Sequence, residues 1–178
     1  MFVITQSARA TYILLIMAYL VTTPPTQAAT KEQKLKAAFL VQFVKYTTWP
    51  NDNLDTITIG IFGRNTFTDA FERYEGKRLH GREIVVKTIE RIEEIRGCCQ
   101  LLFISKYKEV EVEKILNRLQ HDPVLTVSEA TAFSTRGGII HFIRKGTKQK
   151  FIINITNAKK ASISLDTRMQ NIAYAIEK

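Results

Sequence analysis

Hydrophobic residues recur every three or four positions along the segment 30–50, which is the spacing of one face of a helix. Thr30 is followed three residues later by Gln33, and this pair matches the capping box that begins many helices. Thr47 is β-branched and stands shortly before Pro50, a residue that disfavours helix at the position before it. The pattern therefore predicts a helix of about four turns that starts after Thr30 and ends near Thr47.

Short apolar runs bounded by glycine and polar residues follow this helix and predict β-strands. Helical patterns separate several of the runs, so we expect an α/β three-layer sandwich with a mostly parallel sheet. A polar loop at Lys145–Lys148 between two apolar runs predicts a C-terminal antiparallel hairpin. The expected strands are 56–62, 83–89, 100–105, 122–129 and the two arms of the hairpin within 137–155, and the expected helices are 66–74, 108–120 (with Val110, Ile115, Leu116 and Leu119 facing inward) and 166–177.

The first 29 residues have the composition of an export signal. Arg9 gives a basic start, and Thr11–Val21 is an uncharged run that is too short for the ~20 residues of a membrane-spanning helix. A Pro-Pro pair precedes small residues, so we expect a signal peptidase to cut after Ala28 or Ala29. An uncleaved anchor and an N-terminal helix of a cytoplasmic protein are the alternatives.

Residues 30–178 would form the exported part, which is close to the commonest size for a single domain with one core. The chain is 45% hydrophobic, so we expect one globular unit. The formal charge of the whole chain is +9, and removing the single arginine of the leader leaves +8. Outside the cytoplasm, this charge favours contact with an acidic protein face or an anionic membrane surface over contact with nucleic acid.

Cys98 and Cys99 are adjacent, and they are the only two cysteines of the chain. Neighbouring Cα atoms lie ~3.8 Å apart, which is shorter than the ~5.5 Å usual for a disulfide, so a bridge between neighbours is rare. We expect both cysteines to be buried free thiols. A vicinal bridge and an intermolecular bridge are the alternatives.

The sequence contains no familiar catalytic motif. The first strand ends at Gly63, but GIFGRNTF lacks the further glycines of a dinucleotide fingerprint and the Gly-Lys-Ser/Thr ending of a P-loop. A structural turn is the favoured interpretation, and an anion-binding role for Gly63 and Arg64 is the alternative. His80, His121 and His141 lie far apart and form no metal-binding pair, so we expect no metal and no cofactor. A nucleophile elbow is also missing, and we do not expect an enzyme.

Basic residues gather in and after the loop of the expected hairpin. A solvated face is the favoured interpretation of this cluster, and a dedicated binding patch is the alternative. The residues are Arg144, Lys145, Lys148, Lys150, Lys159 and Lys160.

Six motifs occur in order along the expected domain: KAAFLVQFVKYTTWP (36–50), IGIFG (59–63), GKRLHGREIVV (76–86), CQLLFIS (99–105), GGIIHFI (137–143) and KFIINITNAKKASISLDTRMQNIA (150–173). Together they cover nearly the whole chain after the leader. In this combination the sequence resembles the YfiR-like family of bacterial periplasmic proteins.

The resemblance implies a non-enzymatic periplasmic protein that binds the sensing domain of an inner-membrane diguanylate cyclase and holds the cyclase inactive. Release of the cyclase under envelope or redox stress would raise cyclic di-GMP and promote biofilm formation. Better-known relatives have disulfides between distant cysteines, and Cys99 occupies the position before QLLFIS where relatives commonly have one. Because Cys98 is its only possible partner within the chain, we do not expect redox sensing through a structural disulfide.

Contact with the cyclase would need exposed anchors and a surface that steers the encounter. For Trp49, covering the core is an equally favoured role. The expected anchors are Tyr46, Trp49 and Pro50 at the end of the first helix, and the expected steering surface is Arg144, Lys145 and Lys148.

Three further residues are expected to be structural. Gly81 would supply a positive φ in a turn, Arg82 would pair with an internal carboxylate, and Asn154 would bind backbone groups where the hairpin ends. Two other functions stay open, a periplasmic module that senses a nucleotide or an amino acid and an uncharacterised hydrolase. The sequence also leaves open whether the chain forms a homodimer.

Overall fold

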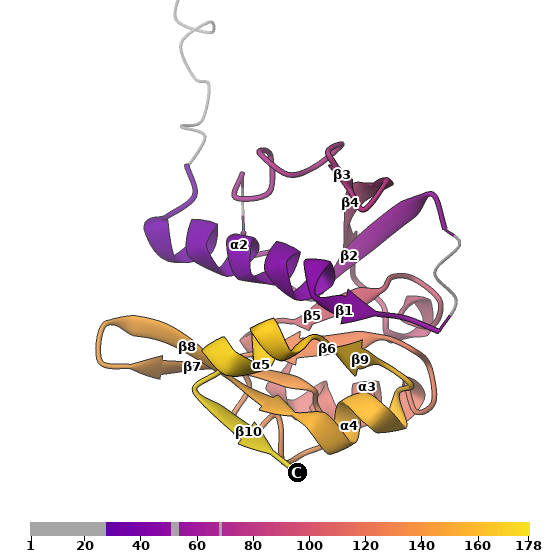
Figure 1. The fold of residues 1–178 in the computed structure, drawn as a ribbon, viewed down its shortest axis with the longest axis vertical. Coiled ribbons are helices and arrows are strands. Elements are labelled where there is room, and N and C mark those ends of the chain that lie inside the picture. The colour runs from indigo at the N-terminus through magenta and orange to yellow at the C-terminus, as the bar shows by residue number, and fades with distance from the viewer. Residues whose placement is uncertain (1–27, 51–53, 68) are drawn as a thin grey trace, which may run out of the picture.

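The structure is a computed structural model that describes residues 28–50, 54–67 and 69–178 (Figure 1). The predicted signal peptide lies almost entirely outside these residues. Within the described ranges, no helix is long and apolar enough to cross a membrane. The helices are α2 (Lys31–Lys45), α3 (Val112–Arg118), α4 (Ile155–Lys160) and α5 (Thr167–Ile172), with 3-10 helices η1 (Ile92–Glu94) and η2 (Lys106–Glu111); the strands are β1 (Thr47–Thr48), β2 (Thr56–Phe62), β3 (Arg78–Leu79), β4 (Arg82–Ile89), β5 (Leu101–Ile104), β6 (Leu125–Ser128), β7 (Ile140–Lys145), β8 (Lys148–Asn154), β9 (Ser164–Leu165) and β10 (Ala175–Glu177).

Eight strands form the main sheet in the order β10-β8-β7-β6-β5-β2-β4-β3. The five central strands β7, β6, β5, β2 and β4 are parallel to one another. Parallel strands need connections that cross over the sheet. The strands β7 and β8 form the antiparallel hairpin, and β1 and β9 pair separately from the main sheet. The predicted α/β class, mostly parallel sheet and hairpin are confirmed, whereas the three-layer arrangement stays an expectation.

The central strands bury both faces, because successive side chains of a strand point to opposite sides. In β5, Leu101 and Phe103 belong to the hydrophobic cluster that contains the buried side of α2, while Leu102 and Ile104 belong to the cluster that contains α3. Fully apolar strands such as β5 are typical of parallel sheets that are covered on both faces.

The helix α2 confirms the first predicted element, including its cap. Thr30 and Gln33 form both hydrogen bonds of the capping box, and the helix ends at Lys45, close to the predicted end near Thr47. On its buried side, Phe39 and Phe43 meet two rings of the hairpin, with the centroids of Phe43 and Phe151 4.8 Å apart. These aromatic contacts attach the first helix to strands that come a hundred residues later in the chain.

The segment 66–74 was predicted to be a short helix, but residues 69–76 form successive turns instead. The side chain of Asn65 accepts a hydrogen bond from the backbone N–H of Phe67, a local bond that competes with helix formation. Phe67 and Phe71 are both buried, and their ring centroids lie 5.0 Å apart. Tertiary burial of these rings therefore decides the path of this segment.

Two other helix predictions need correction. The segment 108–120 begins as the 3-10 helix η2 before α3, and Val110, which was expected to face inward, is 90% exposed. The last helix ends at Ile172, because residues Ala175–Glu177 pair with β8 as the parallel strand β10. Hydrogen bonding to a sheet edge therefore replaces the final turns of the predicted helix.

The expected structural residues lie at turns and caps. Gly81 has a φ of +81°, in the left-handed region for which glycine was expected. Arg82 is buried, and its guanidinium lies 6.0 Å from the ring centroid of Trp49. Asn154 caps α4 by accepting from the backbone N–H of Asn157, and its amide donates to the carbonyl of Ser134.

The cysteines differ from the expectation of free thiols, because the structure joins Cys98 and Cys99 in a vicinal disulfide. A turn at Arg96 and Gly97 comes directly before the two cysteines, which precede β5. Cys99 packs over the middle of β2, where a Cβ on Gly60 would meet its sulfur at 2.8 Å. Because Gly60 has no side chain, Cys99 can pack directly against the sheet.

Candidate functional site

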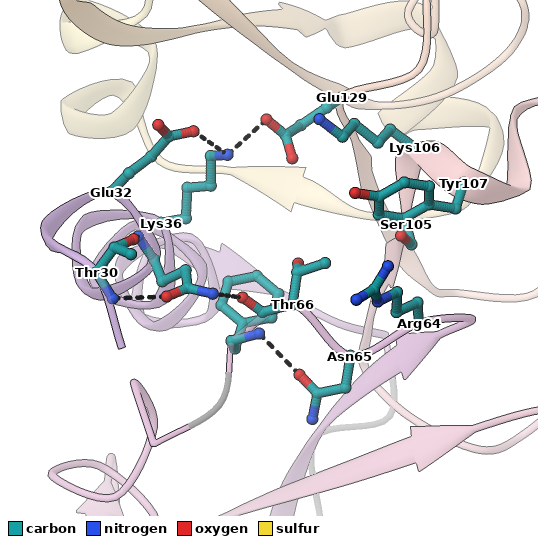
Figure 2. Close-up of a pocket in the computed structure, with 12 residues that line it drawn as sticks. Thr30, Glu32, Lys36, Arg64, Asn65, Thr66, Ser105, Lys106, Tyr107 and Glu129 are labelled. Carbon is teal, nitrogen blue, oxygen red and sulfur yellow. Dashed lines mark hydrogen bonds and ion pairs between the residues drawn. The ribbon is translucent and has the colours of Figure 1, made fainter. Parts of the chain in front are cut away.

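The strand order reverses between β2 and β5, because the chain passes from β2 to β4 on one side and then returns to β5 on the other. In open α/β sheets, ligands bind outside the carboxyl ends of the strands at such a point. The structure has a cavity of about 400 Å³ at this place (Figure 2). We call it the switch-point cavity, and its lining residues are Thr30, Glu32, Gln33, Lys36, Arg64, Asn65, Thr66, Phe67, Ser105, Lys106, Tyr107 and Glu129.

Four separate segments supply these residues. Three of the segments directly follow the parallel strands β2, β5 and β6, whose last residues lie in register with one another. The fourth segment is the first turns of α2, which closes the cavity from the side (Figure 2). Residues from positions 30 to 129 therefore converge because parallel strands end at the same edge of the sheet.

A buried lysine is part of an ion-pair network that joins α2, the segment after β6 and the hairpin at one wall of the cavity. The Nζ atom of Lys36 lies 2.6 Å from a carboxylate oxygen of Glu32 and 2.6 Å from one of Glu129. Arg144, in the hairpin, lies 3.3 Å from the other oxygen of Glu32. The hydrogen bond from Lys36 lowers the pKa of Glu32, and attraction to the nearby cations acts in the same direction against the opposing effect of burial.

Side-chain hydrogen bonds also hold the loop after β2 in place. Gln33 donates from its amide to the backbone carbonyl of Thr66, while its carbonyl oxygen accepts from the backbone N–H of Thr30 at 2.6 Å. The start of α2 is thus bound to the loop that carries Arg64. Because the same side chain caps the helix and binds the loop, both walls of the cavity are positioned together.

The opposite wall carries two cations beside an aromatic ring. Arg64 and Lys106 lie 5.5 Å and 5.6 Å from the centroid of the Tyr107 ring. Neither cation lies within ion-pair distance of a carboxylate in the part of the chain that the structure describes. Interaction with the ring keeps both side chains at the cavity without neutralising them.

Ser105 follows β5 directly and lines the cavity between these cations and the sheet (Figure 2). Its residue surface is 1% exposed, and its hydroxyl has no hydrogen-bond partner among the described residues. Buried hydroxyl groups are normally paired, so this one calls for an explanation. The wall therefore presents hydrogen-bond donors and positive charge that the fold leaves unused.

The sequence singled out Gly63 and Arg64 for an anion, and the structure places Arg64 in the cavity wall. Gly63 lies outside the lining and has a φ of +87°, which fits the structural turn that was favoured for it. Sequence reasoning missed Lys36, Ser105 and Lys106. The signal that could have found the last two is their position immediately after an apolar strand, where side chains meet the carboxyl edge of the sheet.

The expected anchors for a partner lie in different environments. Trp49 is only 5% exposed and belongs to the core, so its alternative role of covering the core is the correct one and it is not an exposed anchor. Tyr46 is half-buried, with the guanidinium of Arg168 4.9 Å from its ring centroid, and Pro50 is exposed. The indole ring has a large apolar surface, and its burial in the core removes this surface from water.

The basic hairpin residues lie far from Tyr46. Arg144 contacts Glu32 in the first turn of α2, whereas Tyr46 caps the other end of this helix, about 20 Å away along its axis. The hairpin instead adjoins the C-terminal segment, since the Nζ atom of Lys145 lies 4.9 Å from the ring centroid of Tyr174. We call the exposed residues Lys145, Lys148 and Tyr174 the hairpin face. Arg144 also belongs to the expected steering surface, but it precedes Lys145 on β7, points to the other face of the hairpin and contacts Glu32.

The described ranges contain no group of three or more histidine, cysteine or acidic side chains that could hold a metal ion. His141, in β7, is half-buried, and burial lowers its pKa. The three histidines of the sequence do not line the switch-point cavity.

Comparisons with known proteins agree with this fold. A solved structure of a conserved domain protein from Vibrio cholerae is similar, with a TM-score of 0.53 and 12% sequence identity, which supports likeness of fold alone. The match covers 79% of this chain and 60% of that chain, so this chain spans less than two thirds of that protein. No curated protein matches the sequence. The family model described as YfiR/HmsC-like matches residues 33–174, and the chain therefore belongs to the YfiR/HmsC-like family.

Proposed function

We propose that this chain is a periplasmic regulatory protein that binds the periplasmic domain of an inner-membrane diguanylate cyclase and represses it. The observation that carries the proposal is the match of the YfiR/HmsC-like family model to residues 33–174. Membership of this family is consistent with regulation of a diguanylate cyclase. The predicted leader supports export of the domain. No catalytic step is part of this function.

The hairpin face is the surface that we assign to the cyclase. It combines the exposed cations Lys145 and Lys148 with the exposed ring of Tyr174. A central aromatic anchor within a polar surround is typical of binding hot spots, and positive charge speeds encounter with an acidic partner. Tyr174 is the proposed anchor because it lies beside Lys145 and replaces the buried Trp49 in that role.

The repression needs only a moderate difference in affinity. An inhibitor shifts its target by binding the inactive state more tightly than the active state. A preference of about 100-fold, or about 2.7 kcal/mol, moves a balanced cyclase almost completely to the inactive state. One well-packed aromatic anchor and a few steering charges can supply a difference of this size.

Deletion of the gene in a cell that expresses the partner cyclase tests the function. Cyclic di-GMP should rise on deletion and return to its original level when the wild-type chain is supplied. Unchanged cyclic di-GMP with the cyclase present would contradict repression. Crosslinking in the envelope, followed by recovery of the cyclase with this chain, measures the contact independently.

A variant pair tests the surface. Lys145→Glu with Lys148→Glu should abolish repression, because it reverses two charges of the hairpin face while leaving the Arg144–Glu32 ion pair intact. The matched control is Lys114→Glu with Arg118→Glu, which changes the net charge equally on exposed positions of α3. If both double variants repress equally well, the hairpin face is not the contact.

A further inference from the structure

The switch-point cavity contains a buried hydroxyl that the folded chain does not use. Ser105 is 1% exposed, lines the cavity and has no hydrogen-bond partner for its Oγ atom among the described residues. A nearby serine, Ser128 at the end of β6, shows the usual arrangement, because its hydroxyl donates to the carbonyl of Ile104 at 2.7 Å. Ser105 thus differs from its neighbour in lacking an internal partner, and its hydroxyl is available to a bound group.

The charge on the cavity wall indicates what kind of group that is. Both carboxylates that line the cavity, Glu32 and Glu129, contact Lys36 at 2.6 Å. Arg64 and Lys106 are not in ion pairs within the described residues, so the cavity has a positive excess. A guanidinium, an ammonium and a hydroxyl donor favour an oxyanion as the bound group.

We propose that the switch-point cavity binds a small molecule through a carboxylate or phosphate group, which accepts hydrogen bonds from Ser105, Arg64 and Lys106. The cavity of about 400 Å³ lies within the range of small-molecule sites. The Tyr107 ring holds both cations at the rim, so they are positioned before a ligand arrives. The proposal rests on this geometry alone and is independent of the proposed cyclase.

The site also lies where a ligand can affect the rest of the fold. Lys36 connects the cavity wall to α2 and β6, and Glu32 connects it to Arg144 in the hairpin. An oxyanion bound to both Arg64 and Lys106 joins the segment after β2 to the segment after β5. A bound ligand therefore stabilises the folded arrangement in which these segments meet.

Titration of the purified protein with inorganic phosphate and with succinate tests the proposal. Binding is measured by calorimetry and by the melting temperature, with sodium chloride at matched ionic strength as the reference. We expect a saturable signal from at least one anion, and the anion that binds identifies phosphate or carboxylate as the group. Failure of both to saturate up to roughly 10 mM, a range that includes weak sites, would overturn the proposal.

Variants separate a binding role from a structural one. Arg64→Gln and Lys106→Gln should each weaken binding about tenfold or more, and the matched control Lys114→Gln, on exposed α3, should leave it unchanged. Ser105→Ala should weaken binding about tenfold while leaving the melting temperature of the free protein equal or higher, because it removes an unpaired hydroxyl. A Ser105→Ala variant that melts lower and binds as well as the wild type would overturn the assignment.

Discussion

Replacing Lys36 by methionine should destabilise the protein through the two carboxylates that the lysine joins. Its side chain is 11% exposed, and its Nζ atom is 2.6 Å from oxygens of both Glu32 and Glu129. Methionine keeps an unbranched apolar side chain of nearly the same length but removes the charge and all three donors. Glu129 then has no cation within ion-pair distance among the described residues, while Glu32 keeps Arg144.

The expected loss of unfolding free energy follows from how deeply Lys36, Glu32 and Glu129 are buried. Removing one partner of a fully buried ion pair costs about 3–5 kcal/mol, because the other charge is left uncompensated. Here the side chains of Glu32 and Glu129 are 41% and 22% exposed, so water screens part of this cost. We therefore expect Lys36→Met to lower the free energy of unfolding by about 2 kcal/mol, or the melting temperature by about 4–8 °C.

The loss should also depend on pH in a definite direction. Lys36 lowers the pKa of Glu32 below its ordinary value of 4.5, so the folded chain binds protons less readily than the unfolded chain. This contribution to stability is complete above pH 4.5 and disappears as the pH falls through the lowered pKa. The difference between wild type and Lys36→Met should therefore shrink below pH 4.5.

Urea unfolding followed by circular dichroism at pH 7 and at pH 3.5 measures both effects. Lys34→Met is the matched control, since Lys34 lies exposed on the same helix and loses the same charge. The double variant Lys36→Met with Glu129→Gln should recover part of the loss, because it removes the uncompensated charge. An equal loss in Lys34→Met and Lys36→Met, or a loss that does not change with pH, would refute the assignment of the ion-pair bridge.

Two further predictions concern a glycine and the leader. An added methyl group on Gly138 would overlap the buried ring of Phe133, whereas nothing lies within 4 Å of a methyl group on Gly146. Gly138→Ala should therefore lower the free energy of unfolding, measured with urea, by about 3 kcal/mol or more. Gly146→Ala should lower it by about 1 kcal/mol, because Gly146 has a positive φ. Equal costs would contradict the steric argument. Cleavage after Ala28 would turn the backbone nitrogen of Ala29, which lies 2.6 Å from a carboxylate oxygen of Asp69, into an ammonium group. Asp69→Asn should then lower the melting temperature of the processed chain more than that of the uncleaved chain, and an N-terminal mass that places the cut elsewhere would contradict this pairing.

Local patterns were sufficient for the elements whose signals lie within a few residues. The capping box of Thr30 and Gln33 and the apolar spacing after it predicted α2, because both act within one helix. The runs at 56–62 and 83–89 predicted β2 and β4, and the polar loop at Lys145–Lys148 predicted the hairpin. The six family motifs likewise indicated the family that the matching model supports.

Long-range packing decided the elements for which local preference is weak. The segment 66–74 has a helical pattern, but burial of the Phe67 and Phe71 rings and the hydrogen bond that the Phe67 N–H donates to the Asn65 side chain oppose a helix. Residues 69–76 therefore form turns. The last residues have a helical pattern too, yet pairing with β8 makes them a strand. Trp49 was a candidate anchor from its position after the helix, and only the packed core shows that it is buried.

The sequence alone determined the helix start, the central strands, the hairpin and the family. Only the tertiary structure assembled the switch-point cavity, since its walls come from positions 30–36, 64–67, 105–107 and 129. Each of these short segments carries ordinary polar residues that have no motif in common. Parallel strands end at the same edge of a sheet, and this geometry brings the unpaired hydroxyl of Ser105 and the cations of Arg64 and Lys106 to one cavity.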